Sequence, residues 1–118
     1  LLHAICDAML GAAHLKDIGT HFPDNDAAFK NIDSKILLKK TAELVASKGY
    51  KIENIDSIIC AQEPKMKPYI DEMQRTIASI LGIDEEDASV KATTTEKLGF
   101  VGRKEGIAAH AVVLLSKE

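Results

Sequence analysis

The sequence predicts an α/β chain of the α+β type, with helices packed on one face of a small mixed β-sheet. Segments with the apolar spacing of helices and short apolar runs typical of strands follow each other in the order α, α, β, α, β, β. Hydrophobic residues make up 46% of the chain but aromatic residues only 4%, so the core must be aliphatic. The 118 residues are expected to form a single domain, 1–118.

Two helices are expected before the first strand, at residues 1–15 and 34–47. The apolar side chains of the first recur every three or four positions, as on one buried helix face: Leu2, Ile5, Met9 and Ala12 or Ala13. Asp33 can cap the second helix, and Gly49 ends it. The chain opens inside the first helix without a capping residue, so we expect the domain to be incomplete at its N-terminus.

The rest of the chain predicts three strands and one further helix. Residues 50–59 first alternate and then run apolar, which is typical of a strand. Pro68 favours the first turn of a helix at 68–81. Two more short apolar runs predict strands at 88–92 and 106–115.

Composition and charge argue against several kinds of partner and segment. Fifteen basic and 18 acidic side chains give a net charge of −3, which argues against a large nucleic-acid interface. No apolar run is long enough to span a membrane, and no signal peptide is recognisable. Cys6 and Cys60 each lie in an apolar run, which favours buried, reduced thiols over a disulfide or a metal site.

Residues 91–103 are the most informative part of the chain. Three consecutive threonines and a carboxylate, Thr93, Thr94, Thr95 and Glu96, follow a short strand. At such a corner hydroxyls and backbone N–H groups can bind phosphate, while the carboxylate holds a divalent cation. Thr93-x-x-Glu96 is also a capping box, which would only satisfy the free N–H groups of a helix start. The two interpretations are compatible, because a capped helix start also attracts anions.

A histidine and an aspartate lie four residues apart in the first expected helix, and therefore on one face of it. Asp7 could orient His3 as a metal ligand, since metal-binding imidazoles usually donate their other N–H to an oxygen. A plain surface pair is the alternative. His14 falls on another face, and a single histidine does not make a metal site.

Two loops have both a structural and a binding interpretation. Asp17, Asp24 and Asp26 lie in a turn-rich segment, where carboxylates either cap turns or accept hydrogen bonds from sugar or polyol hydroxyls. The loop 61–67 follows a strand and precedes a helix. It is either an ordinary connection or a site whose backbone reads the edge of a nucleotide base.

Taken together, five segments resemble the 2-C-methyl-D-erythritol 2,4-cyclodiphosphate synthases of the non-mevalonate isoprenoid pathway, in the same order and spacing. They are His-Ala-Ile-Cys-Asp-Ala-Met-Leu-Gly-Ala-Ala (3–13), Asp-Ile-Gly (17–19), Phe-Pro-Asp-Asn-Asp (22–26), Ala-Gln-Glu-Pro-Lys-Met (61–66) and Lys-Ala-Thr-Thr-Thr-Glu-Lys-Leu-Gly-Phe (91–100). These segments run the length of the chain, and the last is highly specific to that family.

The resemblance implies a homotrimeric phosphorus–oxygen lyase with active sites between adjacent subunits. Its substrate is 4-diphosphocytidyl-2-C-methyl-D-erythritol 2-phosphate. The 2-phosphate attacks the β-phosphate, cytidine monophosphate leaves, and 2-C-methyl-D-erythritol 2,4-cyclodiphosphate is the product. Zn²⁺, or another divalent transition metal, and Mg²⁺ or Mn²⁺ are the implied cofactors. An apolar channel on the threefold axis, which can take an isoprenoid diphosphate, is also implied.

The resemblance assigns roles to individual residues. Thr94 matches the residue that stabilises the transition state, His3 a zinc ligand, and Glu96 the ligand of the second metal. The positions that match substrate-binding residues are Asp17, Ile18, Gly19, Phe22, Pro23, Asp24, Asn25, Asp26, Ala61, Gln62, Glu63, Pro64, Lys65, Met66, Lys67, Thr93, Thr94, Thr95, Glu96, Phe100 and Arg103. Residues 61–67 match the cytosine pocket. Phe100, Arg103 and Glu105 match residues near the threefold axis, where Glu105 or a bound anion would neutralise Arg103.

The chain departs from the family at its start. The family has about forty further N-terminal residues, which must be accounted for before function is argued. They carry an Asp-x-His pair that supplies two of the three protein zinc ligands. We expect the protein to contain them, and the alternative is a trimeric, catalytically inactive module that binds cytidine nucleotides or prenyl diphosphates. The implied location is the bacterial cytoplasm, or a plastid-type organelle if a transit peptide precedes the chain.

Overall fold

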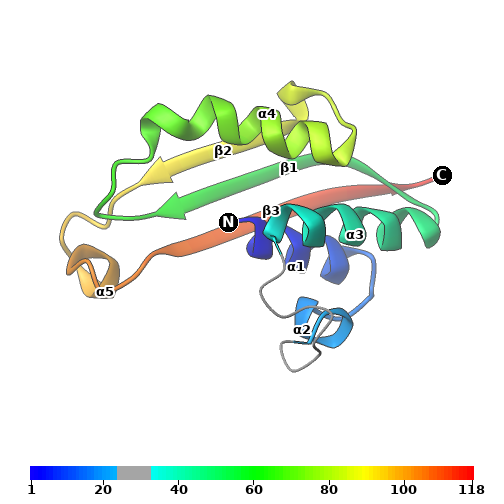
Figure 1. Cartoon of the computed structure of the whole chain (residues 1–118), viewed down its shortest axis with the longest axis horizontal. Coiled ribbons are helices and arrows are strands. Elements are labelled where there is room, and N and C mark those ends of the chain that lie inside the picture. Colours follow the sequence, from blue (N-terminus) through cyan, green and yellow to red (C-terminus); the bar gives the residue numbers. More distant parts are fainter. Residues whose placement is uncertain (24–32) are drawn as a thin grey trace.

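The computed structural model describes residues 1–23 and 33–118 (Figure 1). The α-helices and strands follow each other as α1 Leu2–Ala12, α2 Ile18–His21, α3 Ser34–Ser47, β1 Tyr50–Cys60, α4 Ile70–Leu81, β2 Ala88–Thr93, α5 Gly99–Gly102 and β3 Ala108–Lys117. Short 3-10 turns, η1 Lys67–Tyr69 and η2 Glu85–Asp87, precede α4 and β2. None of the described helices combines the length and the apolar character needed to cross a membrane.

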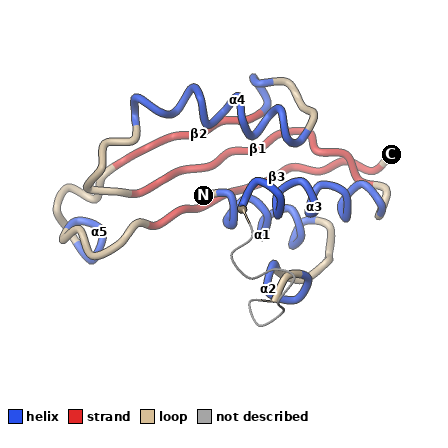
Figure 2. Tube along the Cα trace, in the orientation of Figure 1, coloured by secondary structure: helices blue, strands red, loops and turns tan. Residues whose placement is uncertain are grey.

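The three strands form one mixed sheet in the order β2-β1-β3 (Figure 2). β1 and β2 run parallel, and α4 connects them, as a parallel pair requires. β3 pairs antiparallel with the other edge of β1, and the register shifts once, between Ile52 and Asn54. The expected mixed sheet is therefore confirmed.

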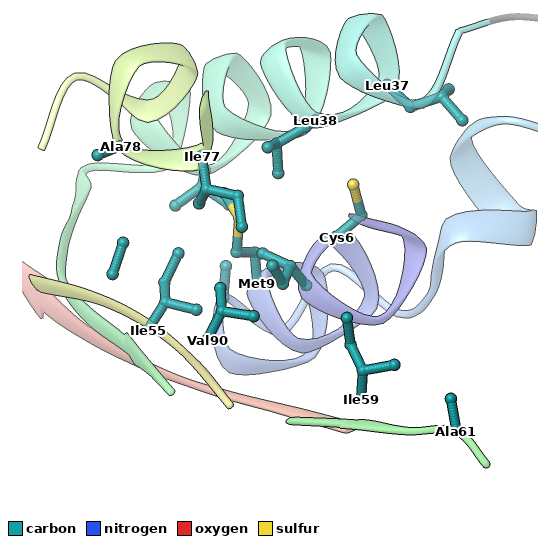
Figure 3. Close-up of a cluster of buried hydrophobic side chains, with 14 residues drawn as sticks. Cys6, Met9, Leu37, Leu38, Ile55, Ile59, Ala61, Ile77, Ala78 and Val90 are labelled. Carbon is teal, nitrogen blue, oxygen red and sulfur yellow. The ribbon is translucent and has the colours of Figure 1, made fainter. Parts of the chain in front are cut away.

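The helices α1, α3 and α4 cover one face of this sheet, as predicted. α4 contacts β2, α1 contacts β3, and α3 lies against both helices (Figure 1). Side chains from all of these layers meet in one core, among them Cys6, Met9, Leu38, Ile55, Ile59, Ile77 and Val90 (Figure 3). Among the described residues, the buried core contains no aromatic side chain. Each buried Leu or Ile contributes about 1.5–3 kcal/mol through removal of its surface from water.

On the opposite face of the sheet, apolar side chains of β3 are exposed in the part of the chain that the structure describes. Along β3 the side chains alternate, because successive residues of a strand point to opposite faces. Ala111 and Val113 pack against the core, whereas Val112 is 72% exposed and Leu114 is 57% exposed. Apolar side chains that gather on one exposed face are typical of a surface that another molecule covers.

The helix ends follow the expected capping chemistry. α3 has the predicted bounds, with the Asp33 carboxylate accepting a hydrogen bond from the Lys35 N–H at 2.8 Å. α4 ends at Gly82, which has φ of 67°. The helix expected at 1–15 is shorter than predicted, because His14 adopts φ of 59°, outside the helical region. The short helices α2 and α5 and both 3-10 turns were not predicted.

Both cysteines are free, in agreement with the sequence prediction. Cys6 is buried in the core and Cys60 is partly buried at the end of β1. Burial raises the pKa of the Cys6 thiol, because the charged thiolate loses its hydration. The thiol is therefore protonated and unreactive at neutral pH.

Candidate functional site

The residues that follow β1 and β2 meet at one end of the sheet. Because these strands are parallel, their last residues, Cys60 and Thr93, pair with each other. The N–H of Ala61 extends the ladder by donating to the Thr93 carbonyl at 3.0 Å. The carboxyl ends of parallel strands are a common place for ligand sites in α/β proteins. The predicted base-binding loop and the predicted phosphate-binding corner are thus neighbours.

The Thr93–Glu96 corner continues into a tight turn rather than a helix. The Leu98 N–H donates to the Thr95 carbonyl at 3.0 Å, and the two central residues have positive φ, 52° at Glu96 and 68° at Lys97. These features are those of a type I′ β-turn, which usually takes Gly, Asn or Asp at its centre. The capping-box prediction for Thr93-x-x-Glu96 is therefore wrong, and α5 begins only at Gly99.

The three threonines of the corner have different roles in the free chain. Thr94 Oγ1 accepts the Glu96 N–H at 3.2 Å, and Thr95 Oγ1 donates to the Leu98 carbonyl at 2.6 Å. Thr93 Oγ1 donates to the Thr94 carbonyl at 3.2 Å. Thr93, Thr94 and Glu96 are exposed, while Thr95 is half-buried. Thr95 thus holds the turn together, whereas the hydroxyls of Thr93 and Thr94 are accessible to a ligand.

Three successive residues of the loop after β1 contact the corner, the turn that follows it and the end of α5. Besides Ala61, Gln62 accepts the Lys97 N–H on its side-chain oxygen at 3.1 Å. Glu63 forms an ion pair of 3.1 Å with Lys104, which follows α5. The loop, the turn and the end of α5 therefore form one connected unit.

His3 lies at the start of α1 and faces the first residues of α3. Its Nε2 atom is 3.2 Å from the Ser34 hydroxyl. Both residues line a cavity of about 660 Å³, which Tyr69 and Met73 also line. Sequence reasoning did not single out Ser34 and Tyr69 as neighbours of His3, because a serine at the first position of α3 and a tyrosine just before α4 carry no functional signal of their own.

In the part of the chain that the structure describes, His3 and Asp7 have other hydrogen-bond partners, so their expected pairing is wrong. Asp7 instead accepts the Ile18 N–H at 2.8 Å. That N–H belongs to the first turn of α2, where backbone donors lack a helical partner, so a nearby carboxylate binds it in preference. Asp7 therefore fixes α2 onto α1.

Asp17 is the cap of α2. Its carboxylate accepts the Thr20 N–H at 2.9 Å and the Thr20 hydroxyl at 2.7 Å. These hydrogen bonds, the hydroxyl first, hold the pKa of Asp17 below its usual range. The capping interpretation is confirmed, and it leaves the second carboxylate oxygen for a ligand. Asp24, Asn25 and Asp26, the other polar candidates in this segment, lie outside the described residues.

Phe100 and Arg103 lie on and just after α5. Phe100 is 50% exposed. Arg103 Nε donates to Glu105 at 2.7 Å, so within the single chain the carboxylate already neutralises the guanidinium. This is one of the two ways of neutralising Arg103 that were expected.

One chain does not bring all candidate residues together. Residues 61–66, the Thr93–Glu96 corner and α5 gather at one end of the sheet, whereas α2 lies below α1, apart from that end (Figure 1). Asp17, Ile18, Gly19, Phe22 and Pro23 belong to this second group. A site that uses both groups must therefore join different parts of an assembly.

The described residues supply only part of the ligand set that the expected metals need. His3 and Glu96 are exposed and chemically suited to zinc and to a hard cation respectively. Residues 1–23 and 33–118 nevertheless hold no group of three or more His, Cys, Asp or Glu side chains that could bind a metal. Zinc in proteins takes three or four protein ligands, so His3 fits zinc only as one member of a larger set.

Comparison with known proteins gives a consistent result. A model of the YgbB family matches residues 1–116. The chain is 64% identical over 117 residues to a protein of Bacteroides fragilis named 2-C-methyl-D-erythritol 2,4-cyclodiphosphate synthase, covering 99% of this chain and 74% of the relative. It is 59% identical over 115 residues to a Porphyromonas gingivalis protein of the same name, covering 98% of this chain and 71% of the relative.

Solved structures agree with the sequence relatives. The bifunctional IspDF of Campylobacter jejuni superposes with a TM-score of 0.96 at 49% identity, over 100% of this chain and 32% of that protein. IspF of Plasmodium falciparum, described as a CDP complex, has a TM-score of 0.86 at 38% identity, over 99% of this chain and 70% of the other.

Proposed function

This chain belongs to the YgbB family of 2-C-methyl-D-erythritol 2,4-cyclodiphosphate synthases, and we propose that the protein acts as a phosphorus–oxygen lyase on 4-diphosphocytidyl-2-C-methyl-D-erythritol 2-phosphate. The products are the cyclic diphosphate and cytidine monophosphate. The observation that carries the proposal is the junction of the 61–67 loop with the exposed hydroxyls of the Thr93–Glu96 corner.

The reaction needs no nucleophile from the protein. An oxygen of the substrate's 2-phosphate forms a bond to the β-phosphorus, the bond from that phosphorus to the oxygen bridging the α- and β-phosphates breaks, and cytidine monophosphate leaves with that oxygen. Several negative charges must therefore be held close together, so catalysis consists of positioning and charge stabilisation. The Thr94 hydroxyl oxygen accepts the Glu96 N–H, so its own proton would be available to donate to an oxygen of the β-phosphate.

The loop 61–67 supplies the proposed nucleotide site. Ala61 is buried and bonded to β2, which leaves the backbone of the following residues to face a base. Met66 packs partly against the core and can offer its remaining surface to the ring. The similarity to a structure described as a CDP complex supports this assignment.

Divalent cations are part of the proposal. When bound, they would supply positive charge that neutralises the diphosphate. His3 would hold Zn²⁺, or another divalent transition metal, together with ligands outside the described residues. Glu96 would hold Mg²⁺ or Mn²⁺, with its exposed carboxylate beside the phosphate corner.

We also propose that the protein is a homotrimer whose open sheet faces meet around the threefold axis. Val112 and Leu114 supply an apolar surface of the kind that subunit interfaces bury. Trimer formation would also explain how α2 of one subunit reaches the corner of another. An isoprenoid diphosphate at the axis would find Phe100 and Arg103 nearby, with Glu105 competing for the guanidinium.

Release of cytidine monophosphate from the authentic substrate tests the function. The wild-type protein should release it, and a chelator should abolish the release. Thr94→Ala should lower kcat about 100-fold, because a lost donor to developing charge costs roughly that much. Ser79→Ala removes an exposed hydroxyl on α4 and should leave kcat unchanged. Robust turnover by Thr94→Ala would contradict the role of that residue. Binding of cytidine nucleotides without turnover by the wild-type protein would favour an inactive binding module instead.

A further inference from the structure

The two central residues of the turn, Glu96 and Lys97, adopt a backbone conformation that residues other than Gly, Asn and Asp rarely adopt. Their φ values of 52° and 68° lie in the left-handed region, although both residues carry long side chains. Such a conformation persists only where its surroundings impose it. The contacts that impose it therefore decide where the Glu96 carboxylate and the Thr94 hydroxyl lie.

Two elements contact this turn. The first is the loop 61–67, from which Gln62 Oε1 accepts the Lys97 N–H at 3.1 Å. The second is α5, which approaches so closely that a Cβ atom at Gly102 would lie 2.1 Å from the Lys97 carbonyl carbon. The turn is thus in contact with both the 61–67 loop and α5.

We propose that Gln62 is a positioning residue that couples the loop 61–67 to the geometry of the Thr93–Glu96 corner. The inference rests on the proposed function, in which the loop binds the nucleotide and the corner binds its β-phosphate. Gln62 lies between two further attachments of the loop, the Ala61 N–H to Thr93 and the Glu63 ion pair to Lys104. A displacement of the loop is therefore passed to the turn through the Lys97 amide.

The coupling has a chemical consequence for the reaction. A base that seats in the loop fixes the loop backbone, and through Gln62 it also fixes the turn that presents Thr94 and Glu96. Only a correctly seated nucleotide then meets a correctly shaped phosphate corner. A neutral amide oxygen suits this task, because it accepts the N–H without adding a negative charge beside the phosphates.

The chain offers a matched control. Gln74 on α4 also uses its side-chain oxygen to accept a backbone N–H, that of Val90, at 3.0 Å. Val90 lies within β2, before the corner. Gln62→Leu and Gln74→Leu therefore remove the same kind of hydrogen bond, one at the turn and one away from it.

Amide hydrogen exchange of the protein without ligand or metal tests the contact directly. Gln62→Leu should speed exchange at Lys97 roughly three- to tenfold, as expected for one lost hydrogen bond, and leave Val90 unchanged. Gln74→Leu should do the reverse, and Gln62→Glu, which keeps an acceptor oxygen, should restore protection at Lys97. Unchanged exchange at Lys97 in Gln62→Leu would overturn the proposal.

Steady-state kinetics test the consequence for catalysis. Gln62→Leu should lower kcat roughly tenfold, because the transition-state contacts are displaced, while inhibition by cytidine monophosphate changes less than about twofold. Gln74→Leu should keep the wild-type kcat. If Gln62→Leu keeps the wild-type kcat and lowers only the affinity for the nucleotide, the coupling is wrong, since Gln62 would then act only within the base pocket. If the wild-type protein releases no cytidine monophosphate, the proposed function is wrong, and exchange at Lys97 still decides whether Gln62 holds the turn.

Discussion

Replacing Gly102 with alanine places a methyl group against the backbone of Lys97. The added Cβ would lie 2.1 Å from the Lys97 carbonyl carbon, 2.6 Å from its Cα and 2.7 Å from its oxygen. Non-bonded carbon atoms pack about 3.5–4.0 Å apart, so α5 or the turn must move by roughly 1.5 Å. Neither partner is a flexible side-chain end, so the movement must come from the backbone.

The expected cost of this movement is about 1–3 kcal/mol of unfolding free energy, which is typical of an overpacked buried site. For a domain of this size we expect Tm to fall by roughly 4–12 °C. Thermal and urea unfolding, followed by circular dichroism, measure both quantities. Because the clash displaces Lys97, the release of cytidine monophosphate should also fall.

Gly11→Ala is the matched control for this prediction. Gly11 lies in α1, and a Cβ at this position meets no atom within 4 Å. Alanine there should be neutral or stabilising by about 0.5–1 kcal/mol, because it favours the helix. If Gly102→Ala changes Tm no more than Gly11→Ala does, the close approach of α5 to the turn is not a determinant of the fold.

Three further predictions concern the assembly, the cap of α2 and the thiols. Val112→Asp on the exposed face of β3 should convert the proposed trimer to monomers in analytical ultracentrifugation, whereas Ile36→Asp, at an exposed apolar side chain on α3, should not; a trimer in both variants would contradict the proposed interface. Because the pKa of Asp17 is lower in the fold, its stabilisation of α2 is present above the ordinary carboxyl pKa and is lost as pH falls through the lowered value; Asp17→Asn should remove this pH dependence, measured by amide exchange in α2. Iodoacetamide at neutral pH should alkylate Cys60 before Cys6, as read by peptide mass spectrometry, because Cys6 is buried with a raised pKa; faster labelling of Cys6 would contradict its burial.

Much of the fold could be predicted from the sequence, because its elements have strong local signals. α3 has a capping aspartate, an apolar stripe and a terminal glycine, and its bounds agree with the prediction. The strands β1 and β2 were recognised from their apolar runs, and each differs from its predicted end by one residue. The order of the elements and their hydrophobic periodicity together predict a layer of helices on one face of the sheet.

The turn at Glu96 and Lys97 could not be predicted, because its cause is not local. A glutamate three residues after a threonine is the pattern of a capping box, and neither central residue favours positive φ. The conformation depends on Gln62 and Gly102, which approach from separate segments. The expected pairing of Asp7 with His3 was wrong for a similar reason, because the actual partner of Asp7, the Ile18 N–H, becomes available only once α2 forms.

The resemblance supplied the functional grouping that individual motifs did not. The threonine corner and the 61–67 loop each had an ordinary structural explanation, and their proximity follows only from the parallel pairing of β1 with β2. That Ser34 and Tyr69 are neighbours of His3, by contrast, follows only from the packing of α1, α3 and the start of α4. Contacts between elements that are distant in the sequence produce no hydrophobic periodicity from which they could be predicted.

A crystal structure of the protein with cytidine diphosphate tests the central proposal most directly. The base should occupy the loop at residues 61–67, and the β-phosphate should lie within hydrogen-bond distance of the Thr94 hydroxyl. Cytidine alone should occupy the loop and leave the corner free of phosphate density. A bound nucleotide whose β-phosphate lies away from residues 93–96 would contradict the account.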